Sequence, residues 1–321
     1  MNILGLQGSP RKDGNAHDLL SMFMKESEKY GVVTETITPH SLNIHPCKEL
    51  LVCEKKGICP IEDDMNKSIY SMIKNADLIV LASPVFFYSV PAQIKALIDR
   101  CQMFWARKYK LKLHDPKGKK RQGFLLSCGA SGGKKLFLGI ELTTKIFFDA
   151  ISAQYKGALT YRHIENPEQM KSHPTVEKDI QETVKKLCSD HFSKPSILVL
   201  SEKGTCTNQI TAAFFNFYTE GKYNIINAGF DTQENLSVDT VKVMEEKNLD
   251  LIYLVPTPMN QINLNQTFDK IIFIGNKQKN FDIKANQTIF WDIEVSADLS
   301  LESLRQLRDK LEKKVLNCIN N

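Results

Sequence analysis

Short apolar runs alternate with amphipathic helical patterns along the whole chain, and this alternation restricts the possible folds more than any other feature. An apolar run of about four to eight residues is typical of a strand buried on both faces, whereas apolar residues spaced three and four apart are typical of a helix. Strands that alternate with helices form a parallel sheet covered by helices on both faces. The alternation therefore predicts an α/β chain.

The first part of the chain contains five strand-like runs separated by helical segments. We expect strands at residues 2–7, 32–38, 77–83, 123–127 and 156–161. We expect helices at residues 15–30, 91–104, 136–151 and 175–191. This pattern predicts a doubly wound parallel sheet with strand order 2-1-3-4-5.

The sequence Ser193-Lys194-Pro195-Ser196 interrupts this pattern, and a second series follows. We expect strands at residues 197–200, 224–227, 251–255 and 270–274, and helices at residues 209–218, 238–247 and 301–318. A length of 321 residues fits two domains. We therefore predict one domain at residues 1–192 and a second, smaller α/β domain with its own parallel sheet at residues 196–321.

Composition and charge exclude several classes of protein. The net charge of +5 is too small to indicate a nucleic-acid partner. We interpret the basic stretch at residues 107–121 as a solvated loop, with a basic rim that attracts phosphorylated cofactors as the alternative. We expect neither a membrane span nor a signal peptide, because the apolar runs are short and no basic segment precedes the first one. Eight cysteines spread over this length favour a reducing, cytoplasmic location.

The first predicted strand runs into a polar loop at residues 8–15, and a helix follows directly. Backbone amides and the positive end of the helix dipole make such a loop an anion site. Ser9 and Asn15 can add hydrogen bonds, and Arg11 can add charge. The spacing matches neither the dinucleotide-binding glycine motif nor the nucleotide P-loop. A phosphate site is therefore predicted, with a plain capped turn as the alternative.

A second loop, at residues 83–91, follows the third predicted strand and contains three consecutive aromatic residues between two prolines. In the predicted strand order, the first and third strands flank the switch point where ligands bind. Phe86, Phe87 and Tyr88 suit the flat ring system of a flavin, although a core aromatic cluster is the alternative. The loop after the fourth strand reaches the same crevice, which makes Cys128 and Gly129 further candidates.

Several segments together resemble the NADPH-dependent FMN reductase and iron–sulfur flavoprotein family, which is flavodoxin-like. The resemblance covers residues 1–190 and rests on residues 8–15, 63–65, 76–77, 83–90 and 92–100. It implies an FMN cofactor whose phosphate is held by Ser9, Arg11 and Asn15. Ala16 departs from the family, which often has a hydroxyl residue there. The segment that packs on the flavin in the family corresponds to Pro84, Val85, Phe86 and Phe87.

The resemblance also implies an oxidoreductase. We expect electrons to pass from NADPH or NADH through FMN to a small acceptor such as a flavin or quinone, with no essential acid–base side chain. A homodimer or homotetramer is the family expectation. Two alternatives stay open: an FMN electron carrier fed by ferredoxin without nicotinamide, and a flavin-binding regulatory or interaction protein.

Cys47, Cys53 and Cys59 lie between the second strand and the next helix. Iron–sulfur flavoproteins carry a compact set of four cysteines there, but Leu50 stands at the second position in this chain. A [4Fe–4S] cluster normally takes four thiolates. We therefore predict no cluster and no metal site, with an outside ligand such as His45 as the alternative.

Residues 196–321 resemble low-molecular-weight tyrosine phosphatases and arsenate reductases. That chemistry needs a cysteine nucleophile followed by an arginine six positions later, and these positions are Ser201 and Thr207 here. The acidic Asp-Pro pair of the family is replaced by the sequence at residues 294–296. We therefore expect an inactive scaffold or oligomerisation domain. Anion binding by the loop, or a redox role for Cys206, remains open.

Overall fold

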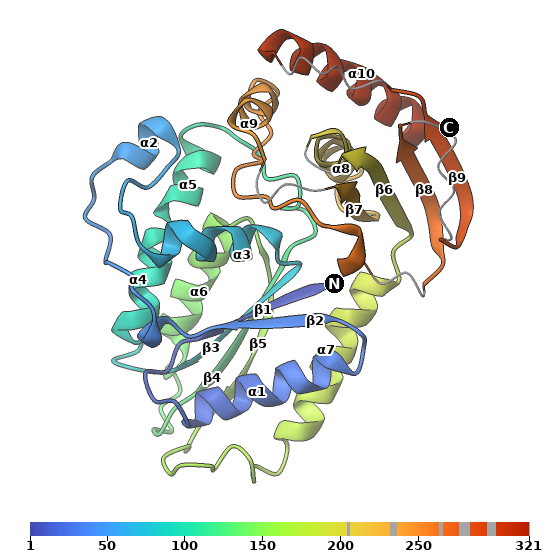
Figure 1. Cartoon of the computed structure of the whole chain (residues 1–321). Coiled ribbons are helices and arrows are strands. Elements are labelled where there is room, and N and C mark those ends of the chain that lie inside the picture. Colours follow the sequence, from blue (N-terminus) through green and yellow to red (C-terminus); the bar gives the residue numbers. More distant parts are fainter. Residues whose placement is uncertain (204–205, 232–235, 263–265, 276–282, 294–299, 321) are drawn as a thin grey trace. The chain divides into compact units, whose positions relative to one another are not determined.

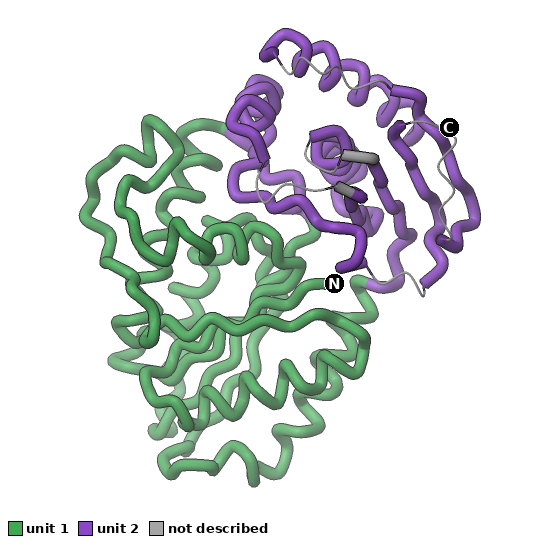
Figure 2. Tube along the Cα trace, viewed as in Figure 1, with its two compact units in different colours: residues 1–112, 120–191 green, residues 113–119, 192–321 purple. Residues whose placement is uncertain are grey.

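Figure 1 shows the computed structural model of the chain, which describes residues 1–203, 206–231, 236–262, 266–275, 283–293 and 300–320. The chain divides into two compact units, which Figure 2 colours separately. Unit 1 comprises residues 1–112 and 120–191, and unit 2 comprises residues 113–119 and 192–321. The short segment 113–119 therefore belongs to unit 2, although unit 1 flanks it in the sequence on both sides.

Unit 1 is built on a five-stranded sheet in which every pair of neighbouring strands is parallel. The strands lie in the order β2-β1-β3-β4-β5, as the sequence predicted. Their bounds are β1 Asn2–Gln7, β2 Val33–Ile37, β3 Leu78–Pro84, β4 Gln122–Cys128 and β5 Gln154–Tyr161. The central strands β3 and β4 are buried along their length, which explains their continuous apolar runs.

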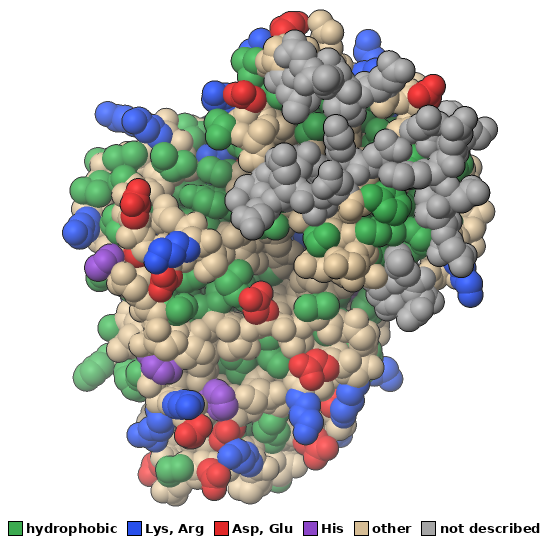
Figure 3. Space-filling view, viewed as in Figure 1, with side chains coloured by type: hydrophobic (Ala, Val, Ile, Leu, Met, Phe, Trp, Pro, Cys, Tyr) green, Lys and Arg blue, Asp and Glu red, His purple; other side chains and the backbone are tan. Residues whose placement is uncertain are grey.

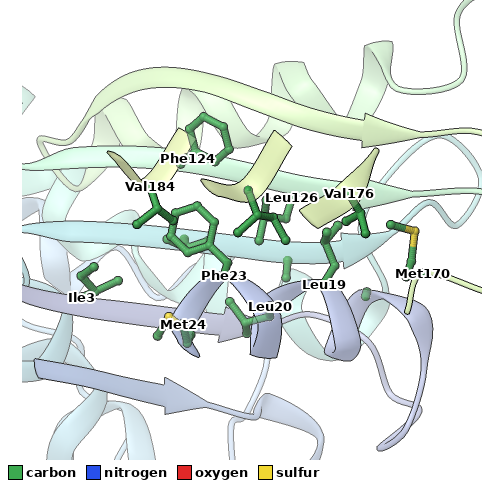
Figure 4. Packing of buried hydrophobic residues seen from close by; sticks show 14 of the residues in the cluster. Ile3, Leu19, Leu20, Phe23, Met24, Phe124, Leu126, Met170, Val176 and Val184 are labelled. Atoms are coloured by element: carbon green, nitrogen blue, oxygen red, sulfur yellow. The ribbon is translucent and has the colours of Figure 1, made fainter. Parts of the chain in front are cut away.

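Two helices, α1 (Asn15–Glu28) and α7 (Val176–Phe192), cover one face of this sheet. Figure 4 shows Leu19, Leu20 and Phe23 of α1 packed between the strands and α7. The opposite face is covered by α3 (Tyr70–Asn75), α4 (Ala92–Arg100), α5 (Gln102–Tyr109) and α6 (Leu138–Ala150) (Figure 1). The core is thus layered as helices, sheet and helices, which is the doubly wound arrangement.

A long connection between β2 and β3 carries the three clustered cysteines. It contains a short 3-10 helix (Pro39–Ser41), the helix α2 (Val52–Lys56) and a π-helical turn (Met65–Ile69) that leads into α3. None of these elements was predicted, because each is shorter than the window in which helical periodicity becomes visible.

Unit 2 is built on a four-stranded parallel sheet with the order β7-β6-β8-β9. Its strands are β6 Ser196–Lys203, β7 Asn224–Asp231, β8 Phe268–Ile274 and β9 Ala285–Trp291. The helices α8 (Thr207–Tyr218), α9 (Val238–Glu245) and α10 (Leu301–Asn320) share one apolar cluster with one face of this sheet. A short 3-10 helix (Met259–Gln261) contributes to the cluster on the other face. The second parallel sheet is therefore confirmed.

Two local predictions were wrong. Residues 251–255 form a turn rather than a strand, because Asp250 Oδ1 accepts the Ile252 amide and Leu254 N donates to Leu251 O. Leu251 and Leu254 both point into the core from this turn, which produces an apolar run without a strand. The predicted helix at 91–104 is two helices, α4 and α5, separated at Cys101. The edge strand β9 was not predicted.

Candidate functional site

Three loops leave the sheet of unit 1 at neighbouring positions on its carboxyl edge. In the strand register, Gln7 of β1 pairs with Ala82 of β3, and Pro84 of β3 pairs with Cys128 of β4. The polar loop 8–15, the aromatic turn 85–89 and the loop after β4 therefore begin side by side. This edge, at the switch point between β1 and β3, is where ligands bind in open parallel sheets.

Gly8 joins the polar loop tightly to β3. Its amide donates to the carbonyl oxygen of Ala82 at 2.7 Å. A Cβ atom at this position would stand 2.9 Å from the same oxygen and 3.0 Å from the Cβ of Ser83. Only glycine permits this approach without a shift of β3, so Gly8 sets where the loop leaves the sheet.

The polar loop presents unpaired donors at the start of α1. No side chain caps this helix, whose N-cap is Gly14, and the amides of residues 15–17 have no acceptor in the described part of the chain. The exposed side chain of Arg11 likewise has no hydrogen-bond or ion-pair partner there. Amides at a helix start together with an unpaired guanidinium form an anion site. The buried hydroxyl of Ser9 instead closes the loop, accepting from Arg11 N at 3.1 Å.

The Asn15 side chain makes two hydrogen bonds to the loop before α7. Its Nδ2 donates to Asn166 O at 2.8 Å, and its Oδ1 accepts from Met170 N at 3.1 Å. Both ends of the amide are therefore used to join the start of α1 to the loop before α7. The Asn15 side chain thus braces the loop before α7, and its predicted role at a phosphate stays a prediction.

The aromatic turn is a two-residue hairpin. Phe86 and Ser89 exchange two backbone hydrogen bonds of 2.9 Å, and the residues between them, Phe87 and Tyr88, have φ angles of 48° and 63°. A turn with positive φ at both central positions normally takes Asn-Gly. Holding such residues there costs about 1–3 kcal/mol each. In this turn Phe87 is fully exposed, and Phe86 and Tyr88 are about half exposed.

The loop after β4 contributes through its backbone. Cys128 O accepts the amide of Val85 at 3.3 Å, and Gly129 N donates to Tyr161 O at 2.9 Å. The Cys128 side chain lies in the core cluster on the α1 face of the sheet. Burial there raises the pKa of its thiol to about 12, so it is a protonated packing group at neutral pH. The Cys128 backbone therefore holds the aromatic turn to β4, and its side chain packs in the core.

A loop with unpaired amides and an exposed aromatic turn thus lie at neighbouring strand ends of a 2-1-3-4-5 sheet. This combination defines the flavodoxin-like class of flavin-binding proteins. The unpaired amides and Arg11 fit a phosphate dianion, and the exposed aromatic side chains fit a flat ring. FMN is therefore compatible with the residues present.

Comparison with known proteins identifies the family. The family model of NADPH-dependent FMN reductases matches residues 1–138. An iron–sulfur flavoprotein of Methanosarcina thermophila is 34% identical over 137 residues, which is 42% of this chain and 68% of that protein. One from Methanocaldococcus jannaschii is 39% identical over 100 residues, or 31% of this chain and 51% of that protein. The chain belongs to the NADPH-dependent FMN reductase and iron–sulfur flavoprotein family, which makes it a flavoprotein of the FMN-dependent oxidoreductase class.

Apart from the Methanosarcina protein, the chain spans about half the length of the curated relatives it matches. Among solved structures, an FMN-dependent NADH-azoreductase from Bacillus anthracis is similar with a TM-score of 0.43 and 12% identity, over 59% of this chain and 100% of that one. An arsenate reductase in a phosphate-binding state is similar with a TM-score of 0.36 and 19% identity, over 39% of this chain and 97% of that one.

The cysteine-bearing connection is fastened to the helices by two buried arginines. Arg100 Nη1 forms an ion pair with Asp63 at 2.5 Å and donates to His45 O, while Arg107 Nη1 donates to Gly57 O at 3.1 Å. Burial raises the pKa of the Asp63 carboxyl, but Arg100 and two backbone amides outweigh it and hold that pKa below its ordinary value. The connection is therefore held by specific contacts along its length.

The thiols on this connection do not fit a four-thiolate cluster. Cys47, Cys53 and Cys59 are exposed or half-buried, and Leu50 at the missing position is 53% exposed. Burial raises the pKa of the Cys53 thiol, with smaller contributions from its neighbours Cys59 and Cys47. Among the described residues, no group of three or more histidine, cysteine or acidic side chains is arranged to hold a metal ion.

The phosphatase-like positions of unit 2 lie at the end of β6 and the start of α8. Ser201 is buried in β6, Cys206 is the N-cap of α8, and Thr207 is its first residue. Burial raises the pKa of the Cys206 thiol, and the Thr207 amide offsets this only in part. Residues 204–205 and 294–296 lie outside the described residues. Ser201 and Thr207 stand where the resemblance to phosphatases places the nucleophilic cysteine and the arginine.

The basic stretch 107–121 is mostly not a solvated loop. Arg107, Lys120 and Arg121 are buried. Lys120 lies 3.9 Å from Asp77, and Arg121 donates to three backbone carbonyls, those of Lys74, Ala76 and Ile151. On the face drawn in Figure 3, basic and acidic side chains are interspersed. In the described part of the chain, no helix has the length and apolarity needed to cross a membrane.

Proposed function

We propose that the protein is an NAD(P)H-dependent oxidoreductase that passes electrons from a reduced nicotinamide through FMN to a small acceptor such as a flavin or quinone. The observation that carries the proposal is that the uncapped polar loop and the exposed aromatic turn begin side by side at one sheet edge. FMN, when bound, supplies the ability to take up a hydride and release its electrons to a second substrate.

The chain's own residues bind and orient the cofactor in this proposal. Arg11 and the first-turn amides of α1 hold the phosphate, while Ser9 and Asn15 keep the loop in shape. Phe86, Phe87 and their turn provide the apolar surface for the ring. The turn itself, residues 85–89, contains no carboxylate, imidazole or amine side chain, and the proposed reaction uses no essential acid–base residue of this chain.

Anaerobic mixing of the FMN-loaded protein with NADPH, and separately with NADH, tests this function. We expect the flavin absorbance near its visible maximum to bleach with at least one nicotinamide, and to recover when a quinone is added. Protein that is reduced rapidly by ferredoxin but by neither nicotinamide is an electron carrier instead. Colourless protein that takes up no added FMN contradicts both enzyme and carrier.

We further propose that the protein forms a dimer through α6. Leu138, Leu142 and Ile146 are spaced four residues apart on this helix and are 52%, 55% and 70% exposed. Glu141 and Lys145 flank the stripe and lie 3.9 Å apart. The pattern is self-complementary: in an antiparallel pair of α6 helices, Leu142 meets its own copy and Glu141 meets Lys145 of the second copy.

A charge placed on this stripe tests the dimer. Ile146→Glu is expected to shift the protein to monomer in analytical ultracentrifugation. Val238→Glu is the matched control, because Val238 is also 70% exposed but lies on α9. A wild-type monomer, or a dimer that both variants retain, contradicts the proposed interface.

We also propose that the chain binds no iron–sulfur cluster and that unit 2 has no phosphatase activity. The misfit of the three thiols supports the first statement, and Ser201 with Thr207 supports the second. Iron and acid-labile sulfide near four per chain after anaerobic purification contradict the first. Hydrolysis of p-nitrophenyl phosphate that Cys206→Ser abolishes contradicts the second.

A further inference from the structure

Unit 2 contains a cavity between the end of α10 and the outer strands of its sheet, which no part of the flavin chemistry uses. Its volume is about 330 Å³. Its walls are formed by Lys270, Gln287, Ile289, Trp291, Lys314, Asn317 and Cys318. The first four come from β8 and β9, and the other three are spaced so that they share one face of α10.

The wall formed by β8 and β9 lies where the paired side chains of these strands change from apolar to polar. Ile274 pairs with Trp291, Ile272 pairs with Ile289, and Lys270 pairs with Gln287. Since alternate residues of a strand share a face, all six side chains lie on the face that α10 covers. The two apolar pairs belong to the core between the sheet and α10. Lys270 and Gln287, the polar pair, therefore lie where this core ends and the cavity begins.

The helix side changes character at the same place. Leu311 and Val315 of α10 face the sheet and are fully buried, and Cys318 is the next residue on the same face of the helix. Its sulfur lies 3.7 Å from Nζ of Lys270. A half-buried ammonium and a thiol therefore meet where the two apolar rows end.

Two lysine side chains in the wall of the cavity lack a carboxylate partner within the described residues. Neither Lys270 nor Lys314 forms an ion pair with a carboxylate among the residues that the structure describes, and none of the residues in the wall is acidic. The acidic residues Asp309 and Glu312 of α10 pair instead with Lys247, and Arg308 also contacts Asp309. A thiol accepts only a weak hydrogen bond, so it does not neutralise Lys270.

We propose that this cavity binds a small organic anion, a carboxylate with an apolar body. The carboxylate interacts with Lys270 and Lys314, the amides of Gln287 and Asn317 hydrogen-bond its oxygens, and the apolar body packs on Ile289 and Trp291. A volume of about 330 Å³ accommodates on the order of ten non-hydrogen atoms. This site is independent of the proposed FMN function.

Cys318 lies in the wall, so its alkylation reports whether the cavity is occupied. Full-length protein is treated with iodoacetamide in the presence of increasing benzoate, and modification of the Cys318 peptide is followed by mass spectrometry. We expect saturable protection by benzoate. Benzyl alcohol lacks the charge and acetate lacks the ring, so each requires about tenfold more ligand or more for half-protection.

The variants Lys270→Gln and Lys314→Gln test the charge. Each is expected to raise the benzoate concentration for half-protection at least about fivefold, while Lys310→Gln, an exposed lysine on the same helix, leaves it unchanged. Lys314 is exposed, so its variant keeps the test valid if Lys270→Gln does not fold. Equal protection by benzoate and benzyl alcohol, or wild-type protection in the two variants, overturns the proposal.

Discussion

The carbonyl oxygen of Tyr88 occupies the space that a side chain on Gly139 would need. Gly139 lies in the first turn of α6, and a Cβ atom there would also approach the Tyr88 carbonyl carbon at 3.1 Å and its Cβ at 3.3 Å. The aromatic turn and α6 are therefore in backbone contact. The helix that carries the apolar stripe thus also supports the proposed flavin-binding turn.

Gly139→Ala is expected to displace this turn. The obstructing atoms belong to the backbone, so the contact is relieved only by moving the turn or the helix, at a cost of about 1–3 kcal/mol. FMN affinity, measured by quenching of flavin fluorescence, is expected to fall about tenfold or more. Gly133→Ala is the control, because a Cβ atom at Gly133 meets nothing within 4 Å. Equal FMN affinity in both variants contradicts a role for this contact.

Phe87→Asn separates the strain of the turn from its proposed role. Asparagine tolerates positive φ and is favoured at the first position of this turn type. Because the Phe87 side chain is fully exposed, no core packing is lost. The FMN-free protein is expected to be as stable as wild type or up to about 1 kcal/mol more stable in urea unfolding, while FMN affinity falls about tenfold. Unchanged FMN affinity shows that the ring does not contact the flavin.

Arg11→Gln tests the phosphate site. Removing the unpaired guanidinium is expected to weaken FMN binding about tenfold and to leave the binding of riboflavin, which lacks the phosphate, unchanged. Lys12→Gln removes the neighbouring exposed cation and is expected to have a smaller effect. Isothermal titration with both flavins measures the difference. A parallel loss for riboflavin and FMN excludes a phosphate contact of Arg11.

Asp63→Asn is expected to loosen the cysteine-bearing connection. Loss of the carboxylate leaves buried Arg100 without its charged partner, which typically costs about 3 kcal/mol. The folded-state pKa of Asp63 lies below its ordinary value of 3.8, so the ion pair stabilises the protein above that pH and the stabilisation disappears as the pH falls through the folded-state pKa.

Hydrogen–deuterium exchange of residues 57–66 measures this effect. Exchange in Asp63→Asn is expected to be faster than in wild type at pH 7, with the difference shrinking below pH 4. Asp64→Asn is the control, since the partners of Asp64 within the described residues are the exposed Lys67 and the Asn43 amide. Equal exchange in wild type and Asp63→Asn at pH 7 shows that the ion pair does not fasten the connection.

Local sequence determined the sheet of unit 1 and the nature of its loops. The continuous apolar runs of β3 and β4 are typical of strands buried on both faces, so patterning predicted these two strands, whereas the apolar run at residues 251–255 forms a turn. The glycines at positions 8 and 14 and the aromatic residues at 86–88 identified the two loops that meet at the sheet edge. The edge strand β9 was missed because one of its faces remains open, so its sequence lacks a continuous apolar run.

Only the tertiary structure decided what individual polar residues do. Asn15 and Cys128 stand at positions predicted to contact a cofactor; the Asn15 side chain bonds to the loop before α7, and the Cys128 side chain packs in the core. The sequence predicted Arg107 and Arg121 to be exposed, but both are buried. Backbone carbonyls distant in sequence accept their hydrogen bonds and make this burial possible. A short segment specifies its own backbone through local sterics and periodicity. The partner of a side chain is set by which distant segments fold against it, and no local pattern contains that information.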